Sequence, residues 1–221
     1  MRSTAGSDRN QRHNGTDAAP PSTVDAERVL RFGRVPRLVH RTTGWLMALC
    51  LGTAACLYFG PLAELVGRRL LVVAVHEISG ILLPVPVLLG LLSREFRSDL
   101  KRLNRFAKYD GEWLRLAVRR REGRQAGKFN AEQKLYASWI AGAAPVMLFT
   151  GLLMWFGGLL PWIPRTSAIF VHDWLALAIG AVVVGHIRMA YRDPLARQGM
   201  RTGYVRRDWA REEHPRWIDP D

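Results

Sequence analysis

Four long apolar segments, separated by arginine-rich connections, constrain the fold of this chain more than any other feature of its sequence. They cover roughly residues 38–60, 70–92, 135–156 and 168–191. Each is about 20 residues or longer, which is enough for a helix to cross a hydrocarbon layer of about 30 Å. Because lipid offers no hydrogen bonds, only helices and closed barrels cross it. The sequence therefore predicts an all-α protein, an integral membrane bundle of four helices.

The basic residues are spread unevenly between the connections, which predicts an orientation. Lys and Arg gather before the first span, between the second and third spans, and after the fourth span, whereas the short connections 60–69 and 161–167 hold few. Positive charge marks cytoplasmic loops. We therefore expect the N- and C-termini and the connection 94–134 to be cytoplasmic. This asymmetry explains the net charge of +13 without nucleic acid, which would require aromatic residues interleaved on a folded platform.

Three further segments complete the predicted organisation. Residues 1–27 are polar and lack the apolar core of a secretory signal, so we expect a disordered tail, with the first span as an uncleaved anchor. Residues 28–195 form the predicted membrane domain, and residues 196–221 a cytoplasmic C-terminal segment. Within the long connection, Arg97–Arg121 is predicted to form an amphipathic helix against anionic headgroups.

Four of the six histidines fall within the predicted spans, where ionisable residues are costly and therefore functional candidates. The topology places His76 and His172 at similar depths near the outer side, and His40 and His186 near the inner side. His172 and His186 are 14 residues apart, an advance of about 1,400° that is some 40° short of four turns. They therefore share nearly one helix face, about 21 Å apart along its axis.

This geometry predicts two stacked b-type haems, each held by imidazoles from two helices. Two imidazoles fill both axial positions of the iron and favour electron transfer over oxygen binding. Covalent c-type haem is excluded because no C-x-x-C-H motif is present. Small residues one turn after three of the histidines would leave room for a porphyrin, although close helix packing uses small residues too; they are Gly44, Gly80 and Ala176. A non-redox membrane protein, whose histidines carry protons or join helices, remains the alternative.

Several sequence blocks carry a family resemblance: Arg37–His40, His76–Gly80, Gly127–Lys134, Met200–Val205, Trp209–Ala210 and His214–Trp217. With these blocks, residues 28–218 resemble the cytochrome b (gamma) subunit of membrane-bound respiratory formate dehydrogenases. The histidine spacing is shared with other di-haem subunits, including those of hydrogenases. The block Gly127–Lys134 and the tail after the fourth span are more specific to the formate dehydrogenase type.

The resemblance implies a membrane-anchor subunit of the bacterial plasma membrane that passes electrons from a dehydrogenase to a quinone. His76 and His172 would bind the outer haem, and His40 and His186 the inner one. The implied partners are an iron–sulfur subunit and a catalytic dehydrogenase subunit, since the chain has no substrate-oxidising site of its own. A hydrogenase or another oxidoreductase remains an alternative partner.

The resemblance also implies an acceptor site for menaquinone or ubiquinone near the inner haem, formed by Asn130, Gln133 and Lys134. Asn130 and Gln133 also fit a helix N-cap and capping box, which needs no quinone. Family members commonly have Gly at the position of Glu132. Glu77 and Asp173 follow the outer ligands and could tune the outer haem or meet a partner, although the helix dipole also favours acids near a helix start.

Overall fold

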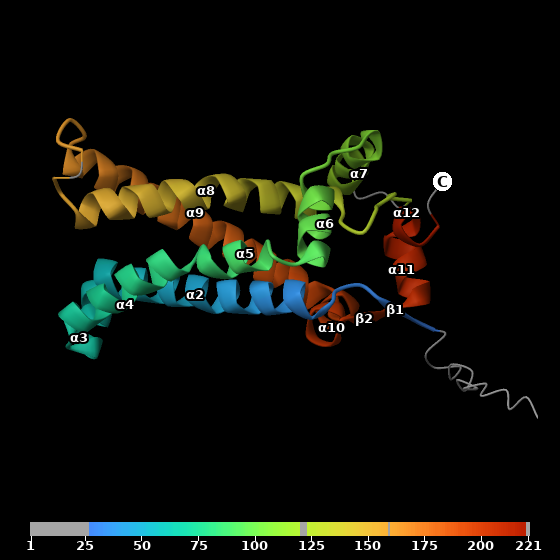
Figure 1. The fold of residues 1–221 in the computed structure, drawn as a ribbon, viewed down its shortest axis with the longest axis horizontal. Helices are drawn as coiled ribbons and strands as arrows, with labels where there is room; N and C mark the ends of the chain where they lie inside the picture. Colours follow the sequence, from blue (N-terminus) through green and yellow to red (C-terminus); the bar gives the residue numbers. More distant parts are fainter. Residues whose placement is uncertain (1–26, 120–122, 159, 220–221) are drawn as a thin grey trace, which may run out of the picture.

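Four long helical segments run side by side in the computed structural model, which describes residues 27–119, 123–158 and 160–219 (Figure 1). They are α2 (Arg34–Tyr58), α4 (Arg69–Leu82) continued by α5 (Val85–Gly90), α8 (Ala131–Trp155) and α9 (Arg165–Arg192). Helix α2 packs along α4, and α8 packs along α9. The helical character of the four apolar segments is therefore confirmed, with bounds that differ from the prediction by a few residues.

Length and hydropathy identify membrane spans within the described part of the chain. Three segments qualify by themselves: Arg69–Gly90, Ala131–Trp155 and Arg165–Arg192. Helix α2 qualifies together with α3 (Gly60–Val66), which follows it after a bend of 107°. A helix therefore occupies most of the segment 60–69, which the sequence predicts to be only a short connection.

Proline shapes the second span. Pro84 lacks a backbone N–H and cannot donate to the Gly80 carbonyl, which Leu83 contacts instead, so α4 ends at Leu82 and α5 begins at Val85. Helix α8 remains one helix although it contains Pro145. Membrane helices tolerate such prolines because neighbouring groups satisfy the freed backbone atoms.

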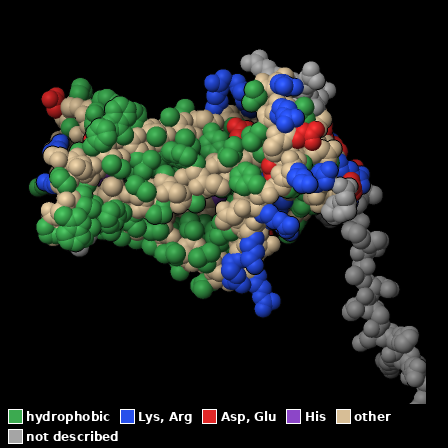
Figure 2. All heavy atoms as spheres, turned by 90° about the horizontal axis from the view of Figure 1, so that it is seen from above, with side chains coloured by type: hydrophobic (Ala, Val, Ile, Leu, Met, Phe, Trp, Pro, Cys, Tyr) green, Lys and Arg blue, Asp and Glu red, His purple; other side chains and the backbone are tan. Residues whose placement is uncertain are grey.

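The outer faces of the long helices are apolar. Large side chains lie exposed along them, among them Leu70 at 86%, Trp45 at 70% and Leu177 at 65% of their surface. Figure 2 shows this apolar surface along the body of the molecule, with Lys and Arg gathered mainly at the end that carries α6 and α7. Contiguous apolar surface of this kind is unfavourable in water and suits the hydrocarbon of a bilayer.

A folded cap closes the basic end of the bundle (Figure 1). Its helices are α6 (Arg94–Leu103), α7 (Lys108–Val118), α10 (Pro194–Thr202), α11 (Arg207–Glu213) and α12 (Pro215–Ile218). Strands β1 (Arg28–Leu30) and β2 (Tyr204–Arg206) pair antiparallel, with Val29 opposite Val205. The all-α prediction missed this short sheet. The predicted boundary at residue 195 falls within α10, and the tail predicted over residues 1–27 lies outside the described residues except for Glu27.

The single helix predicted over Arg97–Arg121 is wrong, because α6 and α7 are separate helices. The Asp110 carboxylate accepts a hydrogen bond from the Ala107 N–H at 2.6 Å and so starts a new helix at Lys108. The same carboxylate is held by the Lys134 ammonium at 2.7 and 2.9 Å, and Asp99 is likewise held by Lys128 at 2.6 and 2.8 Å. Both ion pairs are buried, so α6 and α7 are fixed to the beginning of α8.

Arg31 joins three distant parts of the cap. Its guanidinium, only 2% exposed, donates to the Lys128 carbonyl at 3.0 Å and contacts His214 Nε2 at 2.9 Å. It also lies over the Trp209 ring at 4.9 Å. Burial lowers the pKa of Arg31 to about 10 and, with the charge of Arg31, lowers the pKa of His214 to about 3. His214 is therefore neutral, with Nδ1 donating to the Gly127 carbonyl at 2.7 Å and Nε2 accepting from Arg31.

The stability of the cap should fall in acid because of His214. In the unfolded chain the His214 imidazole binds a proton near pH 6.5, whereas in the folded chain it does so only near pH 3. The stability that is present above pH 6.5 is therefore lost as the pH falls towards 3. The slope is about 1.4 kcal/mol per pH unit within this window. Thermal unfolding of detergent-solubilised protein at pH 7.5 and 5 measures it. His214→Gln should weaken the pH dependence, and an unchanged dependence would contradict this assignment.

The buried Asp110–Lys134 pair should be essential to the inner end of α8. Asp110→Asn would leave a buried ammonium without its counter-charge, which costs about 3–5 kcal/mol. Thermal unfolding should show a large drop in midpoint for Asp110→Asn. The matched control is Asp208→Asn, which breaks an exposed ion pair with Arg206 and should change the midpoint little. Equal effects of the two substitutions would disprove the structural role of the buried pair.

Candidate functional site

The four membrane histidines lie together as two pairs. His76 on α4 faces His172 on α9, with ring centroids 6.3 Å apart and planes at 72°. His40 on α2 faces His186 on α9, with centroids 6.0 Å apart and planes at 51°. The structure thus brings together the same pairs that the sequence analysis proposed, and α9 contributes one ring to each.

The separation of the rings fits two imidazoles that share one metal ion. A metal–imidazole bond is about 2.0–2.1 Å, and the ring centre lies about 1.1 Å beyond the nitrogen, so facing rings have centroids about 6 Å apart. Both observed separations agree with this value. Among the described residues, no group of three or more His, Cys, Asp or Glu side chains could hold a metal ion. Each pair therefore offers two ligands, the number that the axial positions of a haem require.

Glycines provide open space beside the rings. Gly44 and Gly80 each lie one turn after a histidine of a pair, and a Cβ atom built on either would meet no atom within 4 Å. At Gly151 on α8, by contrast, a Cβ atom would lie 3.4 Å from the His172 ring. Gly44 and Gly80 therefore leave room for a flat group beside the rings. Gly151 allows the His172 ring to pack closely against α8. The donor set and the space both fit a haem at each pair.

Two threonines that the sequence analysis missed contact the outer pair. Thr53 Oγ1 on α2 lies 2.9 Å from His76 Nδ1, and Thr150 Oγ1 on α8 lies 3.0 Å from His172 Nδ1. The spacing within one helix cannot reveal such contacts, because each joins neighbouring helices. Of the acids next to the outer ligands, Glu77 is half-buried and Asp173 is exposed.

The inner pair has different surroundings. His40 is exposed and His186 is half-buried. The Tyr136 ring on α8 lies 5.9 Å from the His186 ring, and the Tyr136 hydroxyl lies close over Gly185. Tyr136, which was also missed from the sequence, places the beginning of α8 beside the inner pair.

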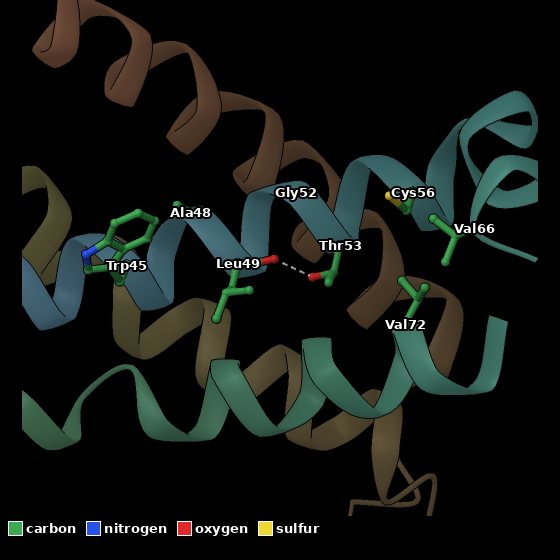
Figure 3. A pocket seen from close by; sticks show the side chains of 8 residues that line it. All are labelled: Trp45, Ala48, Leu49, Gly52, Thr53, Cys56, Val66 and Val72. Carbon is green, nitrogen blue, oxygen red and sulfur yellow. Dashed lines mark hydrogen bonds between the residues drawn. The ribbon is translucent and has the colours of Figure 1, made fainter. Parts of the chain in front are cut away.

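An apolar groove of about 370 Å³ lies between α2 and the beginning of α4 (Figure 3). Its lining comes from α2, the end of α3 and the beginning of α4, and comprises Trp45, Ala48, Leu49, Gly52, Thr53, Cys56, Val66 and Val72. Thr53 belongs both to this lining and to the contact with His76. The lining is almost wholly apolar, so the groove suits a hydrocarbon-like group better than a polar substrate.

The three residues proposed for the quinone site lie together at the start of α8. Asn130 Oδ1 accepts from the Gln133 N–H at 2.9 Å, and Gln133 Oε1 accepts from the Asn130 N–H at 3.0 Å. They form the capping box that the sequence pattern also fitted. Lys134 is buried in its ion pair with Asp110, whereas Asn130 and Gln133 are half-buried.

Comparison with known proteins supports a cytochrome. Residues 31–203 match the family described as prokaryotic cytochrome b561. The chain is 26% identical over 206 residues to the formate dehydrogenase cytochrome b556 subunit of Haemophilus influenzae, covering 86% of this chain and 82% of that protein. It is 30% identical over 118 residues to the nitrate-inducible formate dehydrogenase cytochrome b556(Fdn) subunit of Escherichia coli, covering 50% and 54%.

The family match includes all four paired histidines and the apolar helices that carry them. The resemblance to a formate dehydrogenase cytochrome subunit, noted from the sequence blocks, is confirmed by the two relatives. The chain belongs to the prokaryotic cytochrome b561 family and is a membrane-bound cytochrome b.

Proposed function

We propose that this chain is the membrane-anchor subunit that carries electrons from a partner dehydrogenase, through two b haems, to a quinone. The observation that supports this most strongly is the pair of facing imidazoles at each of two levels of α9, with centroids about 6 Å apart. The ligands on α9 are 14 residues apart, so the two levels lie about 21 Å apart along the helix. Haem, when bound, supplies one-electron redox chemistry.

The protein's own groups would then control how electrons move. His76 and His172 would hold the outer haem, and His40 and His186 the inner one, and ligation by two imidazoles would favour electron transfer over oxygen binding. The apolar outer faces of the helices would keep the path of the electrons within the hydrocarbon layer of the membrane. Helix α9 holds one ligand of each pair and so fixes the distance between the two sites.

The orientation follows from the basic end of the molecule. Residues 28–30, the connection between the second and third spans, and α10–α12 all lie at that end (Figure 1). By the positive-inside rule, this end of the molecule lies on the cytoplasmic side. The pair His76 and His172 is then the outer one, where an iron–sulfur subunit would deliver electrons. The relatives named as formate dehydrogenase subunits favour formate dehydrogenase over a hydrogenase as the partner.

The acceptor site is placed at the start of α8, beside the inner pair. Tyr136 contacts the His186 ring, and Asn130 lies six residues earlier in the chain, about 9 Å along the helix axis. In this proposal the Asn130 amide donates a hydrogen bond to a carbonyl of menaquinone or ubiquinone, and Gln133 lines the site. Lys134 holds the site in place through Asp110.

The haem content tests the proposal directly. A dithionite-reduced minus oxidised spectrum with a pyridine haemochrome assay should give two b haems per chain in the wild type. His186→Ala and His172→Ala should each reduce the count to about one, because each removes one ligand from a different pair. His214→Gln, outside the spans, is the control and should retain two. A colourless wild type after expression with adequate haem would contradict the redox function.

The role of Asn130 in quinone reduction can be separated from its role as a cap. Asp caps a helix about as well as Asn, but Asp lacks the amide donor. Asn130→Asp should therefore keep two haems and slow the oxidation of the reduced haems by menadione about tenfold, the effect of losing one hydrogen bond of about 1.4 kcal/mol. Stopped-flow absorbance measures this rate. If Asn130→Asp reacts as fast as the wild type, Asn130 does not bind the quinone.

A further inference from the structure

Two threonine hydroxyls contact the outer imidazoles at their Nδ1 atoms. The Thr53 hydroxyl on α2 faces His76 Nδ1 at 2.9 Å, and the Thr150 hydroxyl on α8 faces His172 Nδ1 at 3.0 Å. The two contacts are equivalent, since each joins a ligand-bearing helix to the helix packed along it. Each ring of the outer pair is therefore held at its Nδ1 atom by a neighbouring helix.

The direction of these hydrogen bonds follows from the number of protons. A threonine hydroxyl has a single proton to donate. Thr53 Oγ1 lies 2.6 Å from the Leu49 carbonyl and Thr150 Oγ1 lies 2.8 Å from the Val146 carbonyl, and a carbonyl can only accept. The hydroxyl proton is thus committed to the backbone, and the hydroxyl oxygen accepts from the imidazole Nδ1–H. The outer rings are therefore the Nδ1–H tautomer, with the Nε2 lone pair free to bind a metal.

Threonine in an apolar helix also has a simpler explanation. Its hydroxyl commonly bonds the carbonyl four residues earlier, and this bond satisfies the hydroxyl in lipid without any other partner. Thr42 on α2 shows that arrangement, with its hydroxyl 2.9 Å from the Leu38 carbonyl. Thr53 and Thr150 differ because the same oxygen also contacts a side chain on a neighbouring helix, which in both cases is an outer imidazole.

We propose that Thr53 and Thr150 are positioning residues that set the tautomer, the orientation and the electron-donating strength of the outer haem ligands. This inference rests on the proposed di-haem function. A hydrogen bond from the second ring nitrogen makes an imidazole a stronger ligand. A stronger axial ligand stabilises ferric more than ferrous iron, and it therefore lowers the midpoint potential of the outer haem.

The inner pair lacks this arrangement in the described part of the chain, where no hydrogen bond joins the His40 or His186 ring to another group; the ring contacts of His186 are with His40 and Tyr136. The hydroxyls therefore distinguish the two sites. By this effect alone, the outer haem has the lower potential and the inner haem the higher one. Electrons would accordingly run downhill from the outer pair to the inner pair, which is the direction of the proposed function.

The test compares Thr→Val, which keeps the shape but removes the hydroxyl, with Thr→Ser, which keeps the hydroxyl. Thr53→Val, Thr150→Val, Thr53→Ser and Thr150→Ser are titrated potentiometrically in detergent, and their ferric haems are examined by EPR. The His172→Ala variant identifies the outer component by its loss. Thr42→Val is the control, because it makes the same substitution on α2 away from the outer pair.

Thr53→Val and Thr150→Val should each raise the midpoint of the outer haem and change its EPR g-values, while the inner haem stays unchanged. The rise should reach up to about a tenfold change in the redox equilibrium constant, or about 59 mV for one electron. The serine variants should restore wild-type values, and Thr42→Val should leave the outer haem unaltered. If a valine variant loses the outer haem, retention of that haem in the matching serine variant supports the proposal.

Two results would overturn the inference. One is an unchanged outer midpoint and EPR spectrum in both valine variants with two haems bound. The other is an equal shift or haem loss in the valine and serine variants, because the hydroxyl would then be irrelevant. A wild type with no haem is a separate outcome, since it refutes the di-haem function itself.

Discussion

The placement of imidazole rings inside an apolar helix bundle is the constraint on which the rest of the structure depends. A polar ring at this depth is costly without a partner. Here each ring faces another at about 6 Å, and α9 carries one ring of each pair. The 14-residue spacing on α9 fixes the heights of both pairs, so α2 and α4 must present His40 and His76 at matching levels. Both proposed haem sites follow from this one register.

The cap at the basic end keeps that register. Arg31 connects the chain before α2 to the segment before α8 and to His214 near the C-terminus. The buried pairs Asp99–Lys128 and Asp110–Lys134 hold α6 and α7 against the same segment. Because this segment leads into Asn130, the packing that orders the helix ends also shapes the proposed quinone site. In the proposed function, quinone reduction would therefore depend on the same part of the chain as the stability of the cap.

The sequence predicted what repeats locally and missed what depends on distant partners. Hydropathy identified the four apolar segments, and the helical repeat placed His172 and His186 on one face of α9. The separation of α6 from α7 depends on Asp110 and its partner Lys134, and β1 pairs with β2 at the other end of the chain. The contacts of Thr53 and Thr150 cross between helices, so no spacing within one helix reveals them.

The most direct test of the central claim is the position of the irons. An anomalous-difference map, measured at the iron absorption edge from crystals of the haem-loaded protein, locates each iron without reference to the function. The account predicts two peaks, one midway between the rings of His76 and His172 and the other between those of His40 and His186, about 20 Å apart. A single peak, or iron away from these pairs, would contradict it.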